Sequence, residues 1–204
     1  MTYRFNMRRA VRAAAASTVL ASAACSGFLE APNPAVIDAG EVDPVADAPT
    51  LSNSAQQSFA VSLGWLVMYG GWFTGEIDVA ETFPTRNEFG RRAVAVANGS
   101  HTTDTWGPLS VAAAGNHYVL TLPLPTPESN INLVRSHTWL GYSFLLMAEQ
   151  FCQGTVYAGP ALTTADMLDS ALVNFDAAIT KGTANGSAAA TTLVNVARVG
   201  RARA

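Results

Sequence analysis

Two cysteines carry the most reactive side chains of the chain, and the sequence before the first of them is distinctive. The run Leu20-Ala-Ser-Ala-Ala-Cys25 resembles the bacterial lipobox, whose cysteine thiol accepts a diacylglycerol group. Ser22 departs from the motif, because leucine usually stands at that position. We expect a lipid anchor at Cys25. The alternative is an ordinary secreted protein that is cleaved nearby and leaves this thiol unmodified.

The residues before Cys25 have the parts of a secretory leader. Four arginines and no acidic residue lie within the first 24 residues, and the uncharged stretch Ala13–Ala24 completes the leader. That stretch is too short to span a bilayer as a helix. We therefore predict that residues 1–24 form a lipoprotein signal peptide. The acyl chains would hold the mature protein on a membrane, since each buried methylene contributes about 0.8 kcal/mol.

The other thiol and the imidazoles do not form a recognisable catalytic or metal-binding pattern. Cys152 has no second thiol to pair with once Cys25 is lipidated, so we expect a buried or half-buried side chain near a helix end. His137 lies in an apolar helical segment, where a hydrogen-bonded core histidine is the expected role. The three histidines lack the spacing of metal ligands.

The carboxylates give no better indication of catalysis. Glu76, Asp78 and Glu81 share an irregular segment, where we expect them to be solvated. No Gly-x-Ser-x-Gly sequence occurs. We therefore expect no enzyme, no catalytic residue, no metal and no cofactor.

Tryptophans next to predicted loops are the candidates for ligand contact. Indole rings can stack on sugar rings, although an apolar aromatic segment is more often part of a core. Trp72 and Trp106 lie beside loops and are the two candidate ligand-binding residues. Trp139 lies in the most apolar predicted helix and is expected in the core.

The charge distribution excludes one class of partner. From residue 25 onward the chain has 15 acidic residues against 8 basic ones, a net charge of −7. Nucleic-acid binding needs clustered lysine and arginine, so no nucleic-acid partner is expected. The late arginines at positions 198, 201 and 203 have helical spacing and are expected on a solvated helix face.

The elements that must position these residues are predicted to be helices. Residues 25–49 are rich in proline and acidic residues and form an extended lead-in. Apolar residues at helical spacing then predict helices over 50–72, 108–122, 130–152, about 164–181, and from Ser187 onward. We expect Gly70-Gly71 to end the first of these helices and Lys181-Gly182 the fourth. Residues 74–107 are expected to be irregular, and no persuasive strand occurs, so the fold class is all-α with long loops.

Two of these helices suggest a repeat. The pair 134–152 and 165–181 is similar to a helix-turn-helix repeat of the tetratricopeptide kind, with Gly141 and the segment Ala171–Ala178 allowing close approach. The last helix reaches Ala204 without a stop signal, and we expect its apolar face to lack a partner. The predicted helical domain, residues 50–204, is therefore expected to be C-terminally incomplete.

Several stretches together resemble the SusD/RagB-like outer-membrane lipoproteins. The order of these stretches after the lipobox carries the resemblance, although none of them is diagnostic alone. They are Phe28-Leu-Glu-Ala-Pro-Asn-Pro-Ala-Val-Ile37, Thr74-Gly-Glu76, Thr82-Phe-Pro-Thr-Arg86, Trp106-Gly-Pro-Leu-Ser110, Gly141–Glu149 and Val196–Ala204.

The resemblance implies a location, a partner and a role. Such proteins are anchored to the outer membrane and face the exterior, where they cap a SusC-like TonB-dependent transporter. They bind glycans, oligosaccharides or other nutrients for import and break no bond. The ligand identity does not follow from the resemblance, and Cys25 is the single residue whose role carries over. The alternative is a membrane-anchored helical-repeat scaffold for protein–protein interaction, as such repeats commonly provide.

Overall fold

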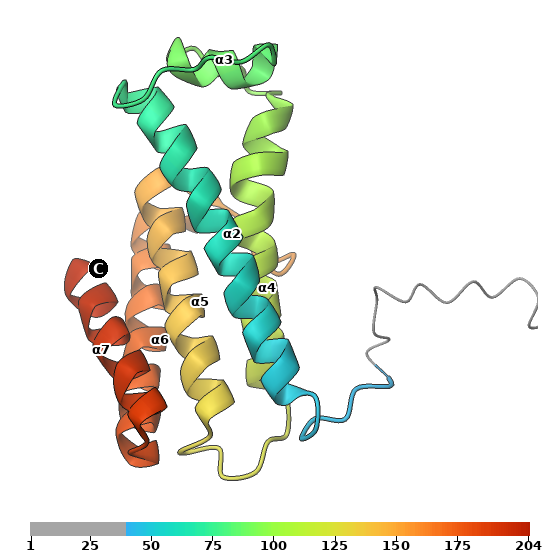
Figure 1. Cartoon of the computed structure of the whole chain (residues 1–204), viewed down its shortest axis with the longest axis vertical. Helices are drawn as coiled ribbons and strands as arrows, with labels where there is room; N and C mark the ends of the chain where they lie inside the picture. The colour runs from blue at the N-terminus through green and yellow to red at the C-terminus, as the bar shows by residue number, and fades with distance from the viewer. Residues whose placement is uncertain (1–39) are drawn as a thin grey trace, which may run out of the picture. The chain divides into compact units, whose positions relative to one another are not determined.

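The computed structural model describes residues 40–204, and the helical body begins at Asp43. The predicted signal peptide, Cys25 and most of the predicted lead-in lie outside the described residues. The described chain is mostly helical, which confirms the all-α class (Figure 1). Its helices are α2 (Ala48–Thr74), α3 (Pro84–Gly90), the π-helical turn η1 (His101–Trp106), α4 (Gly107–Thr121), α5 (Ile131–Gln150), α6 (Thr164–Asn185) and α7 (Ala188–Arg203).

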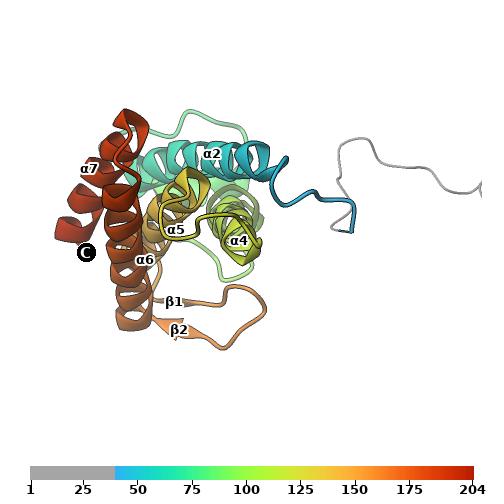
Figure 2. The same cartoon turned by 90° about the horizontal axis from the view of Figure 1, so that it is seen from below.

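The helix α5 is the centre of the bundle. It contacts α2, α4, α6 and α7, and the end-on view in Figure 2 shows α2, α4 and α6 around it. Leu145 and Met147 of α5 are almost completely buried, as predicted from its broad apolar surface. Trp139 of the same helix is half-buried and packs against the core, in agreement with its predicted role. Among residues 40–204, no helix is both long enough and apolar enough to cross a membrane.

The pairing of α5 with α6 follows from small residues at the contact. A Cβ atom on Gly141 would lie 2.7 Å from Cε1 of Phe175, so the glycine lets the phenylalanine ring approach the α5 backbone. Thr163 and Asp166 form a capping box at the start of α6, which agrees with the predicted beginning of this helix at about residue 164. The predicted helix pair therefore exists, whereas its assignment to a tetratricopeptide-like repeat stays a prediction.

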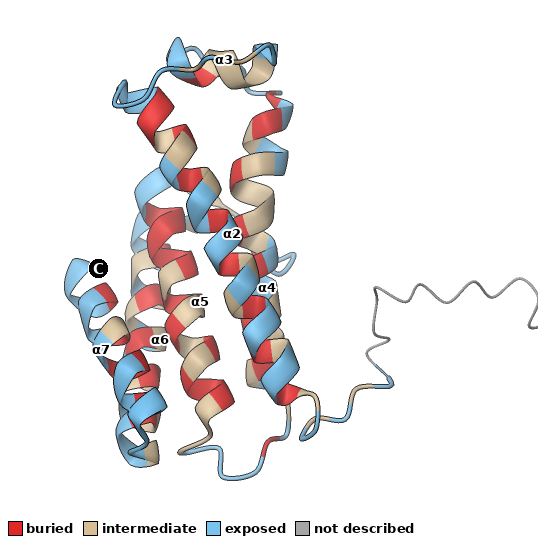
Figure 3. Ribbon diagram, in the orientation of Figure 1, coloured by how far each residue is buried: buried red, intermediate tan, exposed pale blue. Residues whose placement is uncertain are grey.

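The prediction that Gly182 ends α6 is wrong. The helix continues to Asn185 and ends at Gly186, whose φ of 70° is left-handed. Gly182 instead permits a helix contact, because a Cβ there would lie 2.4 Å from Cγ2 of Val194 in α7. This contact brings α7 back along α6, and Figure 3 shows buried positions on α7 alternating with exposed ones. Leu193, Val194, Ala197 and Gly200 are buried, so the expectation that the apolar face of the last helix lacks a partner is also wrong.

The prediction that Gly70-Gly71 ends α2 is wrong for a similar reason. The helix runs through both residues to Thr74, and Gly75 takes the left-handed conformation that ends it, with φ 84°. Gly71 is buried under Ile77, since a Cβ would lie 2.7 Å from the Cδ1 atom of that side chain. Packing against the following turn thus accounts for a glycine inside the helix.

Residues 74–107 are more regular than predicted. Pro84, at the start of α3, begins a short helix, and residues 101–106 form η1 directly before α4. The chain also contains a short hairpin in a segment where no strand was predicted. Its two strands have two residues each, and β1 (Gln153–Gly154) pairs antiparallel with β2 (Leu162–Thr163). Two-residue strands are too short to show an alternating pattern, so sequence periodicity cannot reveal them.

Candidate ligand-binding site

The π-helical turn η1 organises one end of the bundle. In Figure 1, α2 and α4 extend toward α3, and η1 joins the α3 segment to α4. The backbone N–H of Gly107 donates to the carbonyl oxygen of Thr102, which closes the wide turn. A Cβ on Gly107 would lie 2.4 Å from that same oxygen, so the turn requires glycine there. Turns of this type occur frequently at functional sites.

Side chains of η1 face two different neighbours. The rings of His101 and Trp106 both meet the ring of Phe151 edge-on, with centroid separations of 5.4 and 5.0 Å. Asp104 faces the other way and accepts hydrogen bonds from Tyr69 and Arg86. The turn therefore connects an aromatic surface at the end of α5 with a polar network between α2 and α3.

A first pocket lies on the Trp106 side of this turn. Its volume is about 350 Å³, and we call it the Trp106 pocket. Trp106 and Phe151 supply aromatic walls, while Gln153, Thr155 and Thr102 supply polar groups. All three polar side chains are exposed. None of them forms a hydrogen bond with another residue of the range 40–204. The pocket therefore offers an aromatic face beside uncommitted polar groups.

The hairpin β1–β2 holds the indole of Trp106 in place. A Cβ on Gly154 would lie 1.9 Å from Cη2 of Trp106, so the strand backbone rests directly on the six-membered ring. The paired residues Gln153 and Thr163 connect this strand to the start of α6. Trp106 is thus positioned by η1 from one side and by the hairpin from the other.

A second pocket lies under the end of α2, and we call it the overhang groove. It has a volume of about 310 Å³. Its walls come from α2, the α3 segment, η1 and the end of α5. The apolar lining includes Leu66, Phe73, Phe89, Val94 and Phe151, and His101 and Gln150 add polar groups. His101 and Phe151 line both pockets and form the wall between them.

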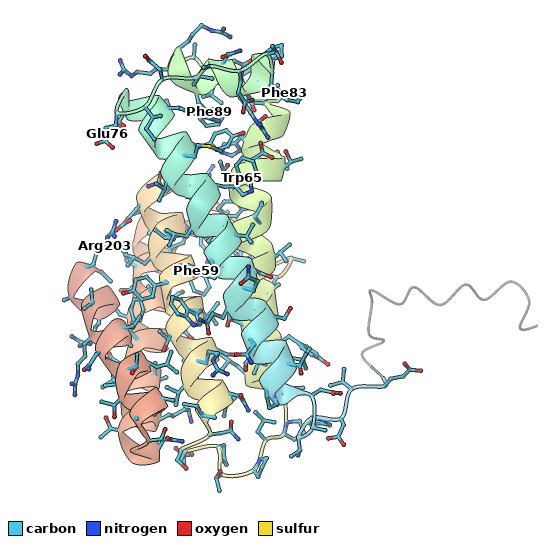
Figure 4. The ribbon with its side chains drawn as sticks, in the orientation of Figure 1. Phe59, Trp65, Glu76, Phe83, Phe89 and Arg203 are labelled. Atoms are coloured by element: carbon cyan, nitrogen blue, oxygen red, sulfur yellow. The ribbon has the colours of Figure 1, made fainter. Side chains whose placement is uncertain are left out.

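A polar network attaches the α3 segment above the overhang groove. Arg86 donates to both carboxylate oxygens of Glu81, at 2.8 and 3.0 Å, and its Nε donates to Asp104 at 3.1 Å. Its guanidinium also lies 5.1 Å from the ring centroid of Trp65 and 5.0 Å from that of Phe83. Figure 4 labels Trp65 on α2 and Phe83 and Phe89 in the α3 segment.

Tyr69 completes this network from α2. Its hydroxyl donates to Asp104, and its ring meets those of Trp72 and Phe89 edge-on at 4.8 and 4.5 Å. Burial, followed by the bond to the Asp104 carboxylate, raises the pKa of Tyr69 to about 12. The phenol therefore stays protonated at neutral pH and acts as a fixed hydrogen-bond donor.

The two predicted ligand-binding tryptophans have different environments. Trp72 is only 5% exposed and packs with Tyr69, so it cannot offer a face to a ligand, and this prediction is wrong. The cause is the continuation of α2 past Gly71, which places Trp72 inside the helix instead of beside a loop. Trp106 is half-buried and lines a pocket, as a ligand-binding residue would.

The remaining reactive side chains are accounted for separately. Cys152 is exposed, so the predicted burial is wrong. Phe151 is extended, and its ring packs inward, which directs the next side chain outward. His137 was expected in the core and is partly buried: its Nδ1 lies 2.9 Å from Oδ1 of Asn174, and burial lowers its pKa. In the described part of the chain, no group of three His, Cys, Asp or Glu residues could hold a metal ion.

The predicted solvation of the acidic trio is correct for two of its members. Glu76 and Asp78 are exposed, and Figure 4 shows Glu76 at the outer turn after α2. Glu81 instead pairs with Arg86 and is partly buried. Two of the late arginines are solvated but paired, Arg201 with Asp176 and Arg203 with Glu149.

Residues at the site that sequence reasoning missed are His101, Gln150 and Phe151. Their positions in the chain gave no signal, because the first lies in a segment predicted to be irregular and the others at a helix end. The sequence Trp106-Gly107-Pro108 predicts the helix that follows it, but it gives no indication of the π-helical turn before it.

Comparison with protein-family models, with curated proteins and with solved structures found no match to this chain.

Proposed function

We propose that this protein is a lipid-anchored, surface-exposed binding protein that captures oligosaccharides for import and breaks no bond. The observation that carries the proposal is the Trp106 pocket. It combines an aromatic face with exposed amide and hydroxyl groups, and small-ligand sites commonly pair an apolar surface with a few polar groups that fix orientation. A sugar ring presents the matching surfaces, since its C–H face is apolar and its rim carries hydroxyls.

The rest of the proposal comes from the sequence. The lipobox-like run before Cys25 supports anchoring, and the ordered resemblance to SusD/RagB-like proteins supports the outer membrane as location. That resemblance also supports a SusC-like TonB-dependent transporter as the partner that receives the ligand. The dominance of helices is compatible with this family, whose N-terminal part is helical.

A membrane-anchored scaffold for protein partners is the second candidate. It is favoured by an aliphatic surface on α2 and α4, where Val61, Val67 and Val111 are 48%, 62% and 62% exposed. Val61 and Val111 also line a shallow groove of about 480 Å³ between these helices. Exposed apolar surface of this kind is typical of protein contact sites when it is contiguous.

Ligand capture is tested with a glycan array, followed by calorimetry of the best-binding oligosaccharide on the full chain without its leader. The Gln153→Ala variant removes an exposed polar group of the pocket without touching the core, and Trp106→Ala removes the aromatic face. We expect each variant to weaken binding about tenfold, equivalent to about 1.4 kcal/mol. Gln57→Ala on α2, outside the pocket, is the matched control and should bind as the parent does.

The outcomes separate the two candidates. Failure of every oligosaccharide to bind, or equal binding by the Gln153→Ala variant and the parent, would contradict capture at the Trp106 pocket. Co-purification of protein partners that is lost on Val67→Asp would then support the scaffold. The anchor is tested separately by palmitate labelling, which should disappear in the Cys25→Ser variant; labelling that persists would remove Cys25 as the acylated residue.

A further inference from the structure

The overhang groove is separate from the Trp106 pocket and has a different chemistry. We propose that the overhang groove binds a compact, uncharged ring compound of bicyclic size that carries one hydrogen-bonding group, such as an indole or a naphthol. This inference goes beyond the proposed capture of oligosaccharides and does not depend on it.

The size of the groove sets the size of the ligand. Its volume of about 310 Å³ lies at the lower limit of small-molecule sites, which span about 300–1,000 Å³. A cavity of about 150 Å³ lined by apolar residues holds benzene. A groove twice that size therefore accommodates a bicyclic ring.

The walls of the groove favour an aromatic or alicyclic ring. Leu66 and Val94 supply aliphatic surface, and Phe89 and Phe151 supply aromatic surface from the α3 segment and the end of α5. Phe73 is 48% exposed at the end of α2 and lines the same groove. A ring that covers this surface gains free energy in proportion to the apolar area removed from water, about 25 cal/mol per Å².

Two polar side chains in the lining remain available for a ligand. Within residues 40–204, neither the imidazole of His101 nor the amide of Gln150 makes a side-chain hydrogen bond. The two groups come from η1 and the end of α5, and the imidazole of His101 meets the ring of Phe151 edge-on. The other polar side chains of the groove are engaged: Thr105 donates to the carbonyl of His101, Thr74 to those of Gly70 and Gly71, and Tyr69 to Asp104.

The charges around the groove favour an uncharged ligand. Among residues 40–204, no lysine, arginine, aspartate or glutamate lines it. Arg92 lies near the end of α2, but its guanidinium donates to the carbonyl oxygens of Phe73 at 2.7 Å and Thr74 at 2.9 Å. An ion in the groove would lose hydration without gaining an opposite charge, and that loss is costly.

Two glycines of α2 allow a matched test. Gly70 lines the groove, and a Cβ there would have one neighbour within range, Oε1 of Gln150 at 4.0 Å. Gly64 lies on the same helix and a Cβ there would meet nothing within 4 Å. Leucine at either position is therefore tolerated by the helix, but Gly70→Leu fills the groove and Gly64→Leu does not.

Indole binding to the full chain is measured by saturation-transfer NMR and calorimetry, with circular dichroism as the check of folding. We expect Gly70→Leu to weaken indole binding at least about tenfold and Gly64→Leu to leave it unchanged. The oligosaccharide affinity of Gly70→Leu should equal that of the parent, whereas Gln153→Ala, at a residue that lines the Trp106 pocket and not the groove, should keep the indole affinity of the parent. These two results separate failure of this proposal from failure of the proposed function.

The proposed requirement for a hydrogen-bonding group on the ligand is tested with indene, which has the shape of indole without its N–H group. The parent should prefer indole, and the Gln150→Met and His101→Phe double variant should lose that preference. If Gly70→Leu fails to fold, Phe73→Ala at the mouth of the groove replaces it and should weaken binding severalfold. Absence of indole binding to the parent, binding unaffected by these groove variants, or equal affinity for indole and indene would each overturn the proposal.

Discussion

Phe175 is a point of contact for three helices. Its ring is completely buried in α6 and lies against Gly141 of α5 and Gly200 of α7. A Cβ on Gly200 would lie 2.4 Å from Cζ of Phe175 and 2.9 Å from Cζ of Tyr142. Tyr142 itself donates to the carbonyl of Val196 at 2.9 Å, so neither ring is free to move aside.

We therefore predict that Gly200→Ala lowers the free energy of unfolding. Adding a methyl group to a packed contact costs about 1–3 kcal/mol. Gly64→Ala is the matched control on α2, where a Cβ meets open space, and alanine should raise the stability by about 0.5–1 kcal/mol. Urea unfolding followed by circular dichroism measures both. Equal stability of Gly200→Ala and the parent would show that the α6–α7 contact is looser than described.

Individual residues at the candidate site were only partly predictable from sequence. Trp106 could be selected because it lies beside a predicted loop. Trp72 satisfied the same criterion, yet it is buried, because its position relative to the core depends on whether Gly70-Gly71 ends the helix. A glycine pair stops an isolated helix readily, but here the turn at residues 75–79 packs Ile77 on Gly71.

The N-terminus of α6 is an element whose stability is set by two side chains. The side chain of Thr163 accepts from the backbone N–H of Asp166, and the Asp166 carboxylate accepts from the backbone N–H of Thr163 at 2.8 Å. Hydrogen bonds from the Thr163 side chain and backbone lower the pKa of Asp166 below its usual value of 3.8.

This cap predicts both a mutational effect and a pH dependence. Thr163→Ala should lower the free energy of unfolding by about 0.5–2 kcal/mol. The pKa of Asp166 is lower in the folded state than in the unfolded state. Its hydrogen bonds therefore stabilise the fold fully at pH values above the pKa of the unfolded state. That stabilisation is lost as the pH falls through the pKa of the folded state.

Urea midpoints measured between about pH 5 and pH 2 test the pH dependence. The parent should lose stability more steeply than Asp166→Asn, which keeps an accepting oxygen but does not titrate. Parallel pH profiles for the two proteins would contradict the assigned role of the carboxylate. Asp78→Asn is the control, because this carboxylate is exposed and makes no hydrogen bond within residues 40–204, so the variant should keep the pH profile of the parent.

At the scale of the whole molecule, the α3 segment is joined to the bundle by a small core cluster around Tyr69, Trp72 and Phe89 and by two arginines. Arg86 links it to Asp104 in η1, and Arg92 links it to the end of α2. The Arg86 pair is largely shielded, with both side chains at most 20% exposed. The main core cluster of the bundle is formed by residues of α2, α4, α5, α6 and α7 and contains no residue of α3.

We predict that Arg86→Met loosens the α3 segment without unfolding the bundle. The variant leaves the Asp104 carboxylate without its ion-pair partner, and unpaired, partly buried charges are unfavourable. Hydrogen exchange should accelerate for backbone amides of residues 84–106 and stay slow in α5 and α6. Arg201→Met breaks an exposed pair and should have little effect on exchange anywhere. Uniform acceleration throughout the bundle would show that the segment and the bundle unfold together.

The sequence by itself determined the number of long helices, their approximate positions, the start of α6 and the acidic character of the body. These features depend on periodicity, capping residues and charge, which are local properties of the chain. The anchor at Cys25 and the resemblance to SusD/RagB-like lipoproteins are also statements about sequence, and they remain predictions.

Only the tertiary structure decided which glycines end helices and which permit helices to touch. It also decided that Trp72 is buried, that Trp106 lines a pocket, and that His101 and Gln150 line one groove together with Phe151. Each of these outcomes depends on a neighbour far away in the chain: Val194 for Gly182, Gly154 for Trp106, and Phe151 for His101. A residue's local sequence carries no information about such a neighbour, because the contact is created by the packing of whole helices.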